Sequence, residues 1–370
     1  MANNAKRRVW RALGLMSGTS LDGVDAALIE TDGERVHGFG PWLTRPYDAA
    51  TRELIRSTFG DKGPIALAER ALTEAHAAAI EKLLAEHSIA RREVDLIGFH
   101  GQTIDHRPDL GRTRQIGDGG LLARLTGIDV VNDFRSADMR AGGQGAPLAP
   151  LYHAALAAGL EKPLAVLNIG GVANVTWIGS DDGLLAFDTG PGGAPIDDWM
   201  LRHTGKAFDR DGETAARGQA DRSVIDRILK LDYYRKIPPK ALDRNAFSDD
   251  LKLDLSLEDG AATLTVLTAA AAAAGLRHLP KPPRRWLVTG GGRHNPSLMA
   301  ALRRELGVPV DPVEAVGWRG DALEAEAFAF LAVRSRLGLP LSLPGTTGVS
   351  RPTTGGAFHP AARSEQGSSR

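Results

Sequence analysis

One short pattern occurs twice in this chain and constrains its fold more than any other feature. Residues 13–17 read as an apolar strand that enters a glycine-rich turn, and residues 24–30 return as a strand that alternates apolar with polar or small side chains. The same order recurs further along, with a strand at 164–169, the turn Gly170-Gly171 and a β-branched return strand at 172–178. The two halves therefore begin alike, which predicts a duplicated fold.

Helices and strands alternate through the rest of the chain. Residues 65–87 are rich in alanine and leucine at helical spacing, and a buried strand is predicted at 94–99. A second such strand at 285–288 runs into Thr289-Gly290-Gly291-Gly292, after which Asn295 caps a helix that begins at Pro296 and continues to about Glu305. This alternation predicts an α/β protein.

A glycine-rich joint at 141–147 separates the two halves. We expect an N-terminal half over residues 1–145 and a C-terminal half over 146–337, and the segment from about 338 to 370 could return to the N-terminal half. A length of 370 residues is enough for two domains, each with its own core.

Composition narrows the class of partner. The 45 basic and 45 acidic side chains balance, and prolines interrupt the basic cluster at 281–285, so neither nucleic acid nor an acidic membrane is an expected partner. The absence of cysteine excludes disulfides and thiolate chemistry. We find no signal peptide and no apolar run approaching the roughly 18 residues of a membrane span. The expectation is a cytoplasmic protein that binds small molecules.

Three glycine turns follow predicted strands: Ser17–Ser20, Ile169–Gly171 and Thr289–Gly292. Glycine lets a ligand approach the backbone, and consecutive amides with nearby hydroxyls form an anion-binding concavity that suits nucleotide phosphates. The chain lacks the GxxxxGK[ST] and GxGxxG patterns of two common nucleotide folds. Asp22 and Asp25 could serve a nucleotide-bound Mg²⁺. The alternative is that each turn is only a hairpin and both aspartates are turn formers.

Other polar groups also follow strands. Asp188 ends an apolar strand before Gly190-Pro191-Gly192, where it could act as a general base or only initiate a turn. The groups at 100–103, 116–118 and 132–138 could gather at one sheet edge and suit a sugar bearing an acid or amide. A metal site at His100, Asp105 and His106 is the rival interpretation. In the helix at 321–330, either Glu324 or Glu326 could enter a cleft.

These residues together carry a resemblance. In chain order the segments are MSGTSLDGVDAALIE, GFHGQTIDHRP, RQIGDGG, VVNDFRSADMRAGGQGAPLAP, LNIGGVANVT, FDTGPG, ATLT, TGGGRHNPSLM and EAEAFAFLA. The chain resembles the anhydro-N-acetylmuramic acid kinase family from about Leu13 to Pro344. The resemblance implies the duplicated actin, hexokinase and Hsp70 type of fold, which is ribonuclease H-like, with an active-site cleft between the domains.

The resemblance also implies an activity. Such an enzyme uses ATP and water to open the 1,6-anhydro ring of anhydro-N-acetylmuramic acid and phosphorylates O6, giving N-acetylmuramic acid 6-phosphate in peptidoglycan recycling. Asp188 would be the catalytic base that activates water. ATP and Mg²⁺ would be bound by Gly18, Thr19, Ser20, Leu21, Asp22, Gly23, Val24, Asp25, Gly170, Gly171, Gly290, Gly291 and Gly292, with the metal at Asp22 and Asp25 and the last three glycines near the adenosine. The sugar would be bound by Gln102, Asp133, Arg135 and Glu324.

Two segments depart from the family pattern, namely Gly193-Ala194-Pro195 and Ala241 to Asn245. They leave open a kinase of the same fold that acts on an ordinary amino sugar or hexose. A nucleotide-binding regulator without turnover is a further alternative. The expected partners are the anhydro sugar and ATP, and a homodimer is one assembly that the sequence allows.

Overall fold

The computed structural model describes residues 8–18, 20–181, 183–244, 247 and 249–361. Its internal contacts define two compact units, unit 1 over residues 1–156, 322–344 and 349–370 and unit 2 over residues 157–321 and 345–348. The first crossing between units falls after Leu156 rather than near residue 145, because the loop at 142–145 is hydrogen-bonded to α4 (Ser136–Arg140) of unit 1. Unit 1 also takes back the chain from residue 322 rather than from 338.

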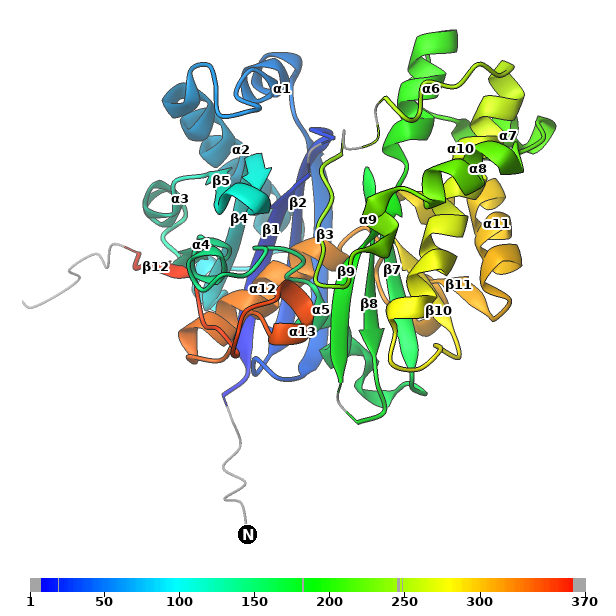
Figure 1. Cartoon of the computed structure of the whole chain (residues 1–370). Helices are drawn as coiled ribbons and strands as arrows, with labels where there is room; N and C mark the ends of the chain where they lie inside the picture. The colour runs from blue at the N-terminus through cyan, green and yellow to red at the C-terminus, as the bar shows by residue number, and fades with distance from the viewer. Residues whose placement is uncertain (1–7, 19, 182, 245–246, 248, 362–370) are drawn as a thin grey trace, which may run out of the picture. The chain divides into compact units, whose positions relative to one another are not determined.

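Unit 1 is built on a seven-stranded sheet with the order β12-β6-β4-β1-β2-β3, and β5 pairs with β4. β1 is antiparallel to β2 and parallel to β4, and β4 is parallel to β6 (Figure 1). Its strands are β1 (Trp10–Ser17), β2 (Gly23–Thr31), β3 (Val36–Pro46), β4 (Leu96–Arg107), β5 (Arg112–Ile116), β6 (Val130–Asn132) and β12 (Ala357–His359).

Unit 2 repeats this topology in a five-stranded sheet with the order β9-β8-β7-β10-β11. β7 is antiparallel to β8 and parallel to β10, and β10 is parallel to β11. Its strands are β7 (Leu164–Ile169), β8 (Val172–Ile178), β9 (Leu184–Pro191), β10 (Trp286–Thr289) and β11 (Val310–Pro312). The strands β9-β8-β7-β10-β11 of unit 2 therefore correspond one for one to β3-β2-β1-β4-β6 of unit 1. This correspondence confirms the predicted α/β duplication.

Side chains along β1 alternate between the two faces of the unit 1 sheet, and helices pack on both faces. Leu13 and Leu15 pack into the core formed with α2 (Ile65–Glu86), whereas Gly14 faces α12 (Leu323–Arg336). A Cβ at Gly14 would lie 1.7 Å from the backbone oxygen of Ala325, so only glycine permits this close approach. The other helices of unit 1 are α1 (Ala49–Arg56), α3 (Gly119–Thr126), α4 and α5 (Pro150–Leu156).

The centre of unit 2 is α10 (Leu257–Ala274), which is buried along most of its length against the sheet and its neighbouring helices. By length and composition, residues Leu257–His278 could cross a membrane, contrary to the expectation from sequence. Because 78% of the apolar window is buried inside the protein, this segment is a core helix. The remaining helices are α6 (Ala194–Thr204), α7 (Glu213–Arg217), α8 (Arg222–Leu229), α9 (Asp232–Arg235), α11 (Pro296–Leu306) and α13 (Pro344–Thr347).

Candidate active site

The turn between β1 and β2 is held by hydrogen bonds between its own residues. The backbone N–H of Leu21 donates to the carbonyl of Gly18 over 3.1 Å, and the Ser20 hydroxyl donates to Asp22 Oδ1 over 3.0 Å. A Cβ at Gly18 would meet only the Ser20 hydroxyl, at 3.6 Å, so the space around this backbone is open. Thr19 lies outside the described residues. The turn therefore offers an accessible backbone to a ligand.

The predicted phosphate-binding residues of this turn differ in what they can offer. Leu21 and Val24 are buried and face the core, so only their backbones can contact a ligand. Gly23 packs against the carbonyl of Arg45, and its burial leaves no space for a side chain. Asp22 is exposed, and Asp25 lies in β2, where its Oδ1 accepts a 2.5 Å hydrogen bond from the Thr44 hydroxyl.

The glycine turns of unit 2 divide into structural and open positions. Gly290 has a φ of +75°, and a Cβ there would lie 2.6 Å from the carbonyl oxygen of Ile169. A Cβ at Gly292 would lie 2.5 Å from the Ile169 side chain, whereas Gly291 has nothing within 4 Å. At Gly170 and Gly171 no neighbour lies closer than 3.4 Å to the position that a Cβ would occupy. Gly170, Gly171 and Gly291 are thus accessible to a ligand, and Gly290 and Gly292 let the two turns pack together.

Asp188 occupies β9 between the buried side chains of Phe187 and Thr189. Its own side chain is partly buried, and its Oδ2 accepts a 2.7 Å hydrogen bond from the backbone N–H of Leu242. Burial raises the pKa of Asp188 to about 7, against the opposing effects of the Leu242 hydrogen bond and the Lys240 ammonium. A carboxylate with this pKa can both accept and release a proton near neutral pH, as a general base requires.

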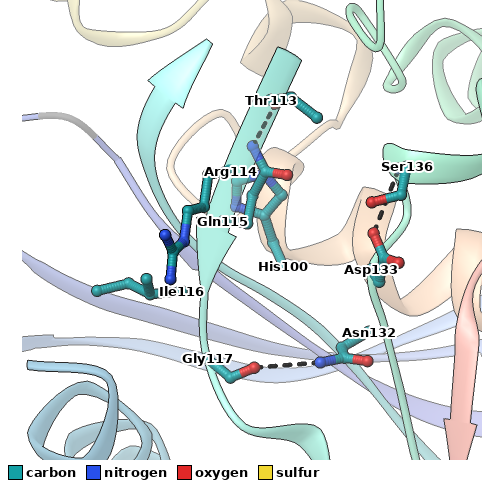
Figure 2. Close-up of a pocket in the computed structure, with 9 residues that line it drawn as sticks. All are labelled: His100, Thr113, Arg114, Gln115, Ile116, Gly117, Asn132, Asp133 and Ser136. Carbon is teal, nitrogen blue, oxygen red and sulfur yellow. Dashed lines mark hydrogen bonds between the residues drawn. The ribbon is translucent and has the colours of Figure 1, made fainter. Parts of the chain in front are cut away.

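A cavity of about 250 Å³ in unit 1 contains part of the predicted sugar site. Figure 2 shows Asp133 accepting a hydrogen bond from the Ser136 backbone and the Asn132 amide donating to the Gly117 carbonyl. Asp133 is exposed, with a φ of 51°. The cavity is lined by His100, Thr113, Arg114, Gln115, Ile116, Gly117, Asn132, Asp133 and Ser136.

Arg135 does not line this cavity, but it contacts His100, which does. Its Nε and Nη2 lie 3.1 and 3.0 Å from His100 Nε2, and its Nη1 donates to the carbonyl of Gly145 over 2.7 Å. His100 Nδ1 faces the carbonyl of Gly101 at 2.9 Å, so the ring is a neutral imidazole that donates there and accepts from Arg135. Burial and the nearby guanidinium hold the pKa of His100 well below its usual range.

The other two predicted sugar-binding residues have different surroundings. Gln102 is fully buried, where its Oε1 accepts a 2.7 Å hydrogen bond from Ser17 and its amide donates to the Thr103 carbonyl. Glu324 is exposed on α12 and raises the pKa of Arg135 through its charge, against the larger lowering by burial. Neither residue lines the 250 Å³ cavity.

The structure does not support the rival metal site. Asp105 pairs with Arg107 and Arg112 instead, at 3.2 and 2.5 Å. Across the described part of the chain, no group of three His, Cys, Asp or Glu side chains is placed to hold a metal ion.

Unit 2 has a cavity of about 410 Å³ that the sequence did not reveal. It is lined by residues of α7, α8, α10 and α11, and its walls combine alanines with the side chains of Arg222 and Arg304. Thr265 lines it, and its buried hydroxyl has no hydrogen-bond partner within the described residues. Ser297, on the first turn of α11, also lines it and lies five residues beyond Gly292. The lining residues are Ala215, Ala216, Gly218, Ala220, Arg222, Ala262, Thr265, Val266, Ser297, Ala300 and Arg304.

Sequence reasoning missed Lys240 and the role of His100. Lys240 is 7% exposed and lies next to Asp188 in the structure, although 52 positions separate them in the chain. Nothing local in the Pro238-Pro239-Lys240 segment indicates that the lysine is buried. The sequence placed His100 in the 100–103 group of the sugar side or in the rival metal site, and nothing in it indicated the contact with Arg135.

The repeated strand order, with accessible glycine turns after β1 and β7, defines the class as two-sheet α/β proteins of the actin and hexokinase type. A sequence profile described as Anhydro-N-acetylmuramic acid kinase matches residues 10–361. This chain belongs to the anhydro-N-acetylmuramic acid kinase family, a family of phosphotransferases. The family and fold expected from the sequence are therefore confirmed.

Full-length relatives agree with this assignment. Proteins named anhydro-N-acetylmuramic acid kinase from Paramagnetospirillum magneticum and Rhodospirillum rubrum are 58% and 57% identical, over 94% and 96% of this chain and 99% and 95% of their own. Among solved structures, the (R)-2-hydroxyglutaryl-CoA dehydratase component A of Acidaminococcus fermentans aligns over 88% of this chain and 99% of its own, with a TM-score of 0.46 and 14% identity.

Proposed function

We propose that this protein is an ATP-dependent kinase that opens the 1,6-anhydro ring of 1,6-anhydro-N-acetylmuramic acid and phosphorylates O6. Water adds to C1 while the bond from C1 to O6 breaks, and O6 takes the γ-phosphoryl group of ATP. The products are N-acetylmuramic acid 6-phosphate and ADP, in peptidoglycan recycling. The observation that carries this proposal is the match to the family and its relatives over nearly the whole chain.

Asp188 is the proposed base. Ring opening by water needs a group that accepts the water proton near C1, and a partly buried carboxylate with a pKa of about 7 suits that task. The hydrogen bond from the Leu242 backbone to Oδ2 fixes the carboxylate and leaves Oδ1 to face a water molecule. Transfer of the phosphoryl group itself relies mainly on positioning and charge stabilisation.

The glycine turns are the proposed phosphate-binding elements. Open backbone at Gly18, Gly170, Gly171 and Gly291 permits close approach of the ATP phosphates. Asp22 and Asp25 would hold Mg²⁺, which binds beside nucleotide phosphates through one or two carboxylates and otherwise through water. An exposed carboxylate at Asp22 fits that requirement. The metal would neutralise charge on the phosphates, and no cluster of three protein ligands is needed.

The 410 Å³ cavity of unit 2 is the proposed adenosine site. Small apolar side chains and two arginines line it, and the buried Thr265 hydroxyl can bond to a nucleobase. Ser297 in its wall is close in sequence to the glycines expected to lie near the adenosine. On the sugar side we propose Asp133 in the unit 1 cavity, together with Arg135, Glu324 and Gln102. Gln102 would contribute by orienting the Ser17 hydroxyl, which donates to its Oε1, because its amide nitrogen already donates to the Thr103 carbonyl. Cytoplasmic location and a homodimer stay predictions.

Mass spectrometry of the product tests the proposed reaction. The protein is incubated with the anhydro sugar, ATP and Mg²⁺ in ¹⁸O-labelled water, with N-acetylmuramic acid and N-acetylglucosamine as competing substrates in parallel reactions. We expect a 6-phosphosugar that carries one heavy oxygen at the anomeric carbon. Turnover of a non-anhydro sugar alone would instead establish an ordinary sugar kinase, and ATP binding with no product from any sugar would indicate a regulator.

A further inference from the structure

Residues 233–242, which run from α9 into the segment after it, hold Asp188 through three hydrogen bonds. The backbone N–H of Asp188 donates to the carbonyl of Lys240 over 3.0 Å, and the backbone N–H of Leu242 donates to Asp188 Oδ2 over 2.7 Å. The Tyr233 hydroxyl donates to the carbonyl of Asp188 over 2.6 Å. Residues 233–242 therefore fix the backbone of Asp188 at two points and its carboxylate at one.

Lys240 places an ammonium group in this segment where an apolar side chain would be less costly. The residue is 7% exposed, and its Nζ lies 4.6 Å from the ring centre of Tyr233 and 5.6 Å from that of Phe187. Its Nζ donates one hydrogen bond, of 3.2 Å, to the carbonyl of Tyr233. Among the described residues no carboxylate lies within 4 Å of it. Two aromatic faces and one carbonyl only partly replace water around a buried charge.

The surroundings of Lys240 oppose its charge, and Asp188 is the group that favours it. Burial and the nearby Arg277 and Lys236 lower the pKa of Lys240 to about 8, whereas the charge of Asp188 raises it. In return the Lys240 ammonium lowers the pKa of Asp188 against the raising effect of burial. The titratable groups around this pair are Tyr233, Tyr234, Lys236, Arg277 and His278. Of these, Lys236 and Arg277 are cations that act on Lys240.

We propose that Lys240 is a positioning residue for the base: its buried ammonium favours the ionised form of the Asp188 carboxylate, and its backbone carbonyl fixes the strand that carries Asp188 by accepting from the Asp188 N–H. This inference rests on the proposed function. It explains why a lysine occupies a nearly closed position between two aromatic rings. A methionine would fill much the same space without a charge.

The test compares Lys240→Met, Lys240→Arg and wild type. Removing the ammonium favours the protonated form of Asp188, so in Lys240→Met we expect the acid limb of kcat/KM to move upward by about one pH unit or more. Activity then falls more at pH 6 than at pH 9, and Lys240→Arg restores the wild-type limb. Lys236→Met is the matched control, because Lys236 is exposed in the same segment and its removal should leave the limb in place.

A second measurement does not depend on turnover. Carboxyl ¹³C NMR, with the Asp188 signal assigned from Asp188→Asn, should show a higher pKa for Asp188 in Lys240→Met than in wild type. A pH-independent loss of activity with an unchanged Asp188 titration in a folded Lys240→Met would overturn the proposal. If wild type does not turn over the anhydro sugar, the proposed function fails, whereas the NMR titration still decides whether Lys240 acts on Asp188.

Discussion

Asp188 combines two opposing requirements in one side chain. Burial within β9 gives it a pKa of about 7, which suits proton transfer at neutral pH. The same burial makes its ionised form unfavourable for folding, because the unfolded chain hydrates the carboxylate fully. The residue proposed to supply the chemistry is therefore expected to reduce stability.

Asp188→Asn should fold, bind ATP and lose turnover. The amide oxygen can still accept the hydrogen bond from Leu242, but an amide cannot take a proton from water. A positioned general base contributes about 10² to 10⁴ in rate, so we expect a loss of at least this size in kcat with little change in ATP affinity. Steady-state kinetics and ATP titration measure both quantities. Near-normal kcat would remove Asp188 from the role of base.

The same variant should be more stable than wild type at alkaline pH. Burial raises the pKa of Asp188 from about 4 in the unfolded chain to about 7 in the folded protein, so the folded state binds the proton more tightly. The stabilisation that comes from this tighter proton binding is fully present below pH 4 and is lost as the pH rises through 7. At pH 8 the ionised group costs on the order of 1–4 kcal/mol. Thermal unfolding should show a higher Tm for Asp188→Asn at pH 8, with a difference that narrows toward pH 5. A pH-independent difference would contradict this account.

At the scale of the element, different glycines of the turn after β10 serve packing and ligand binding. Gly290 and Gly292 lie against Ile169 at the end of β7, and Gly291 between them has open space around it. One sequence pattern of three glycines therefore serves two purposes. The pattern indicates that another group comes close to the backbone. Only the structure shows whether that group belongs to the protein or would be a ligand.

Substitutions at this turn should separate the two purposes. Gly290→Ala places a Cβ 2.6 Å from the Ile169 carbonyl oxygen at a φ of +75°, so we expect a loss of stability of at least about 2 kcal/mol. Gly291→Ala has room for its methyl group and should unfold like wild type, with a raised KM for ATP and an unchanged KM for the sugar. Denaturant unfolding and steady-state kinetics measure these effects. Equal loss of stability in the two variants would contradict the division.

At the scale of the whole molecule, unit 1 is discontinuous in sequence. α12 returns from beyond unit 2 and packs on β1 and β4, where Gly14 and Gly98 allow its backbone to approach the strands. A chain that ends at Leu156 leaves one face of the β1–β2–β4 sheet without its helix. Unit 2, in contrast, is almost continuous from residue 157 to 321.

Truncation should therefore affect the two units differently. We expect residues 1–156 alone to be unfolded or aggregated, because the apolar face that α12 covers would be open to water. Residues 157–321 should form a cooperatively folded unit on their own, since the hydrophobic core around α10 lies entirely within them. Circular dichroism and thermal unfolding of both fragments measure this. A stable, cooperative fragment 1–156 would show that α12 is dispensable for unit 1.

The sequence by itself determined the features that depend on neighbouring residues. The repeated strand, glycine turn and strand are visible because strand period and turn chemistry are local, and the order of the two halves followed from them. The cap at Asn295 is equally local: its side chain accepts from the N–H of Leu298, and α11 begins at Pro296 as predicted. The sequence also placed Asp188 on an apolar strand, although β9 continues past it to Pro191 and does not end there as predicted.

Only the tertiary structure decided what long-range contacts control. The side chains that surround Asp188 come from residues 233–242, and their distance in sequence hides both the raised pKa and the buried Lys240. Likewise α12 was expected in the C-terminal half, because nothing within a helix specifies which sheet its backbone will contact. Gly14 and Gly98 leave the space that it occupies. Burial and pKa depend on atoms brought together by folding, which no local pattern records.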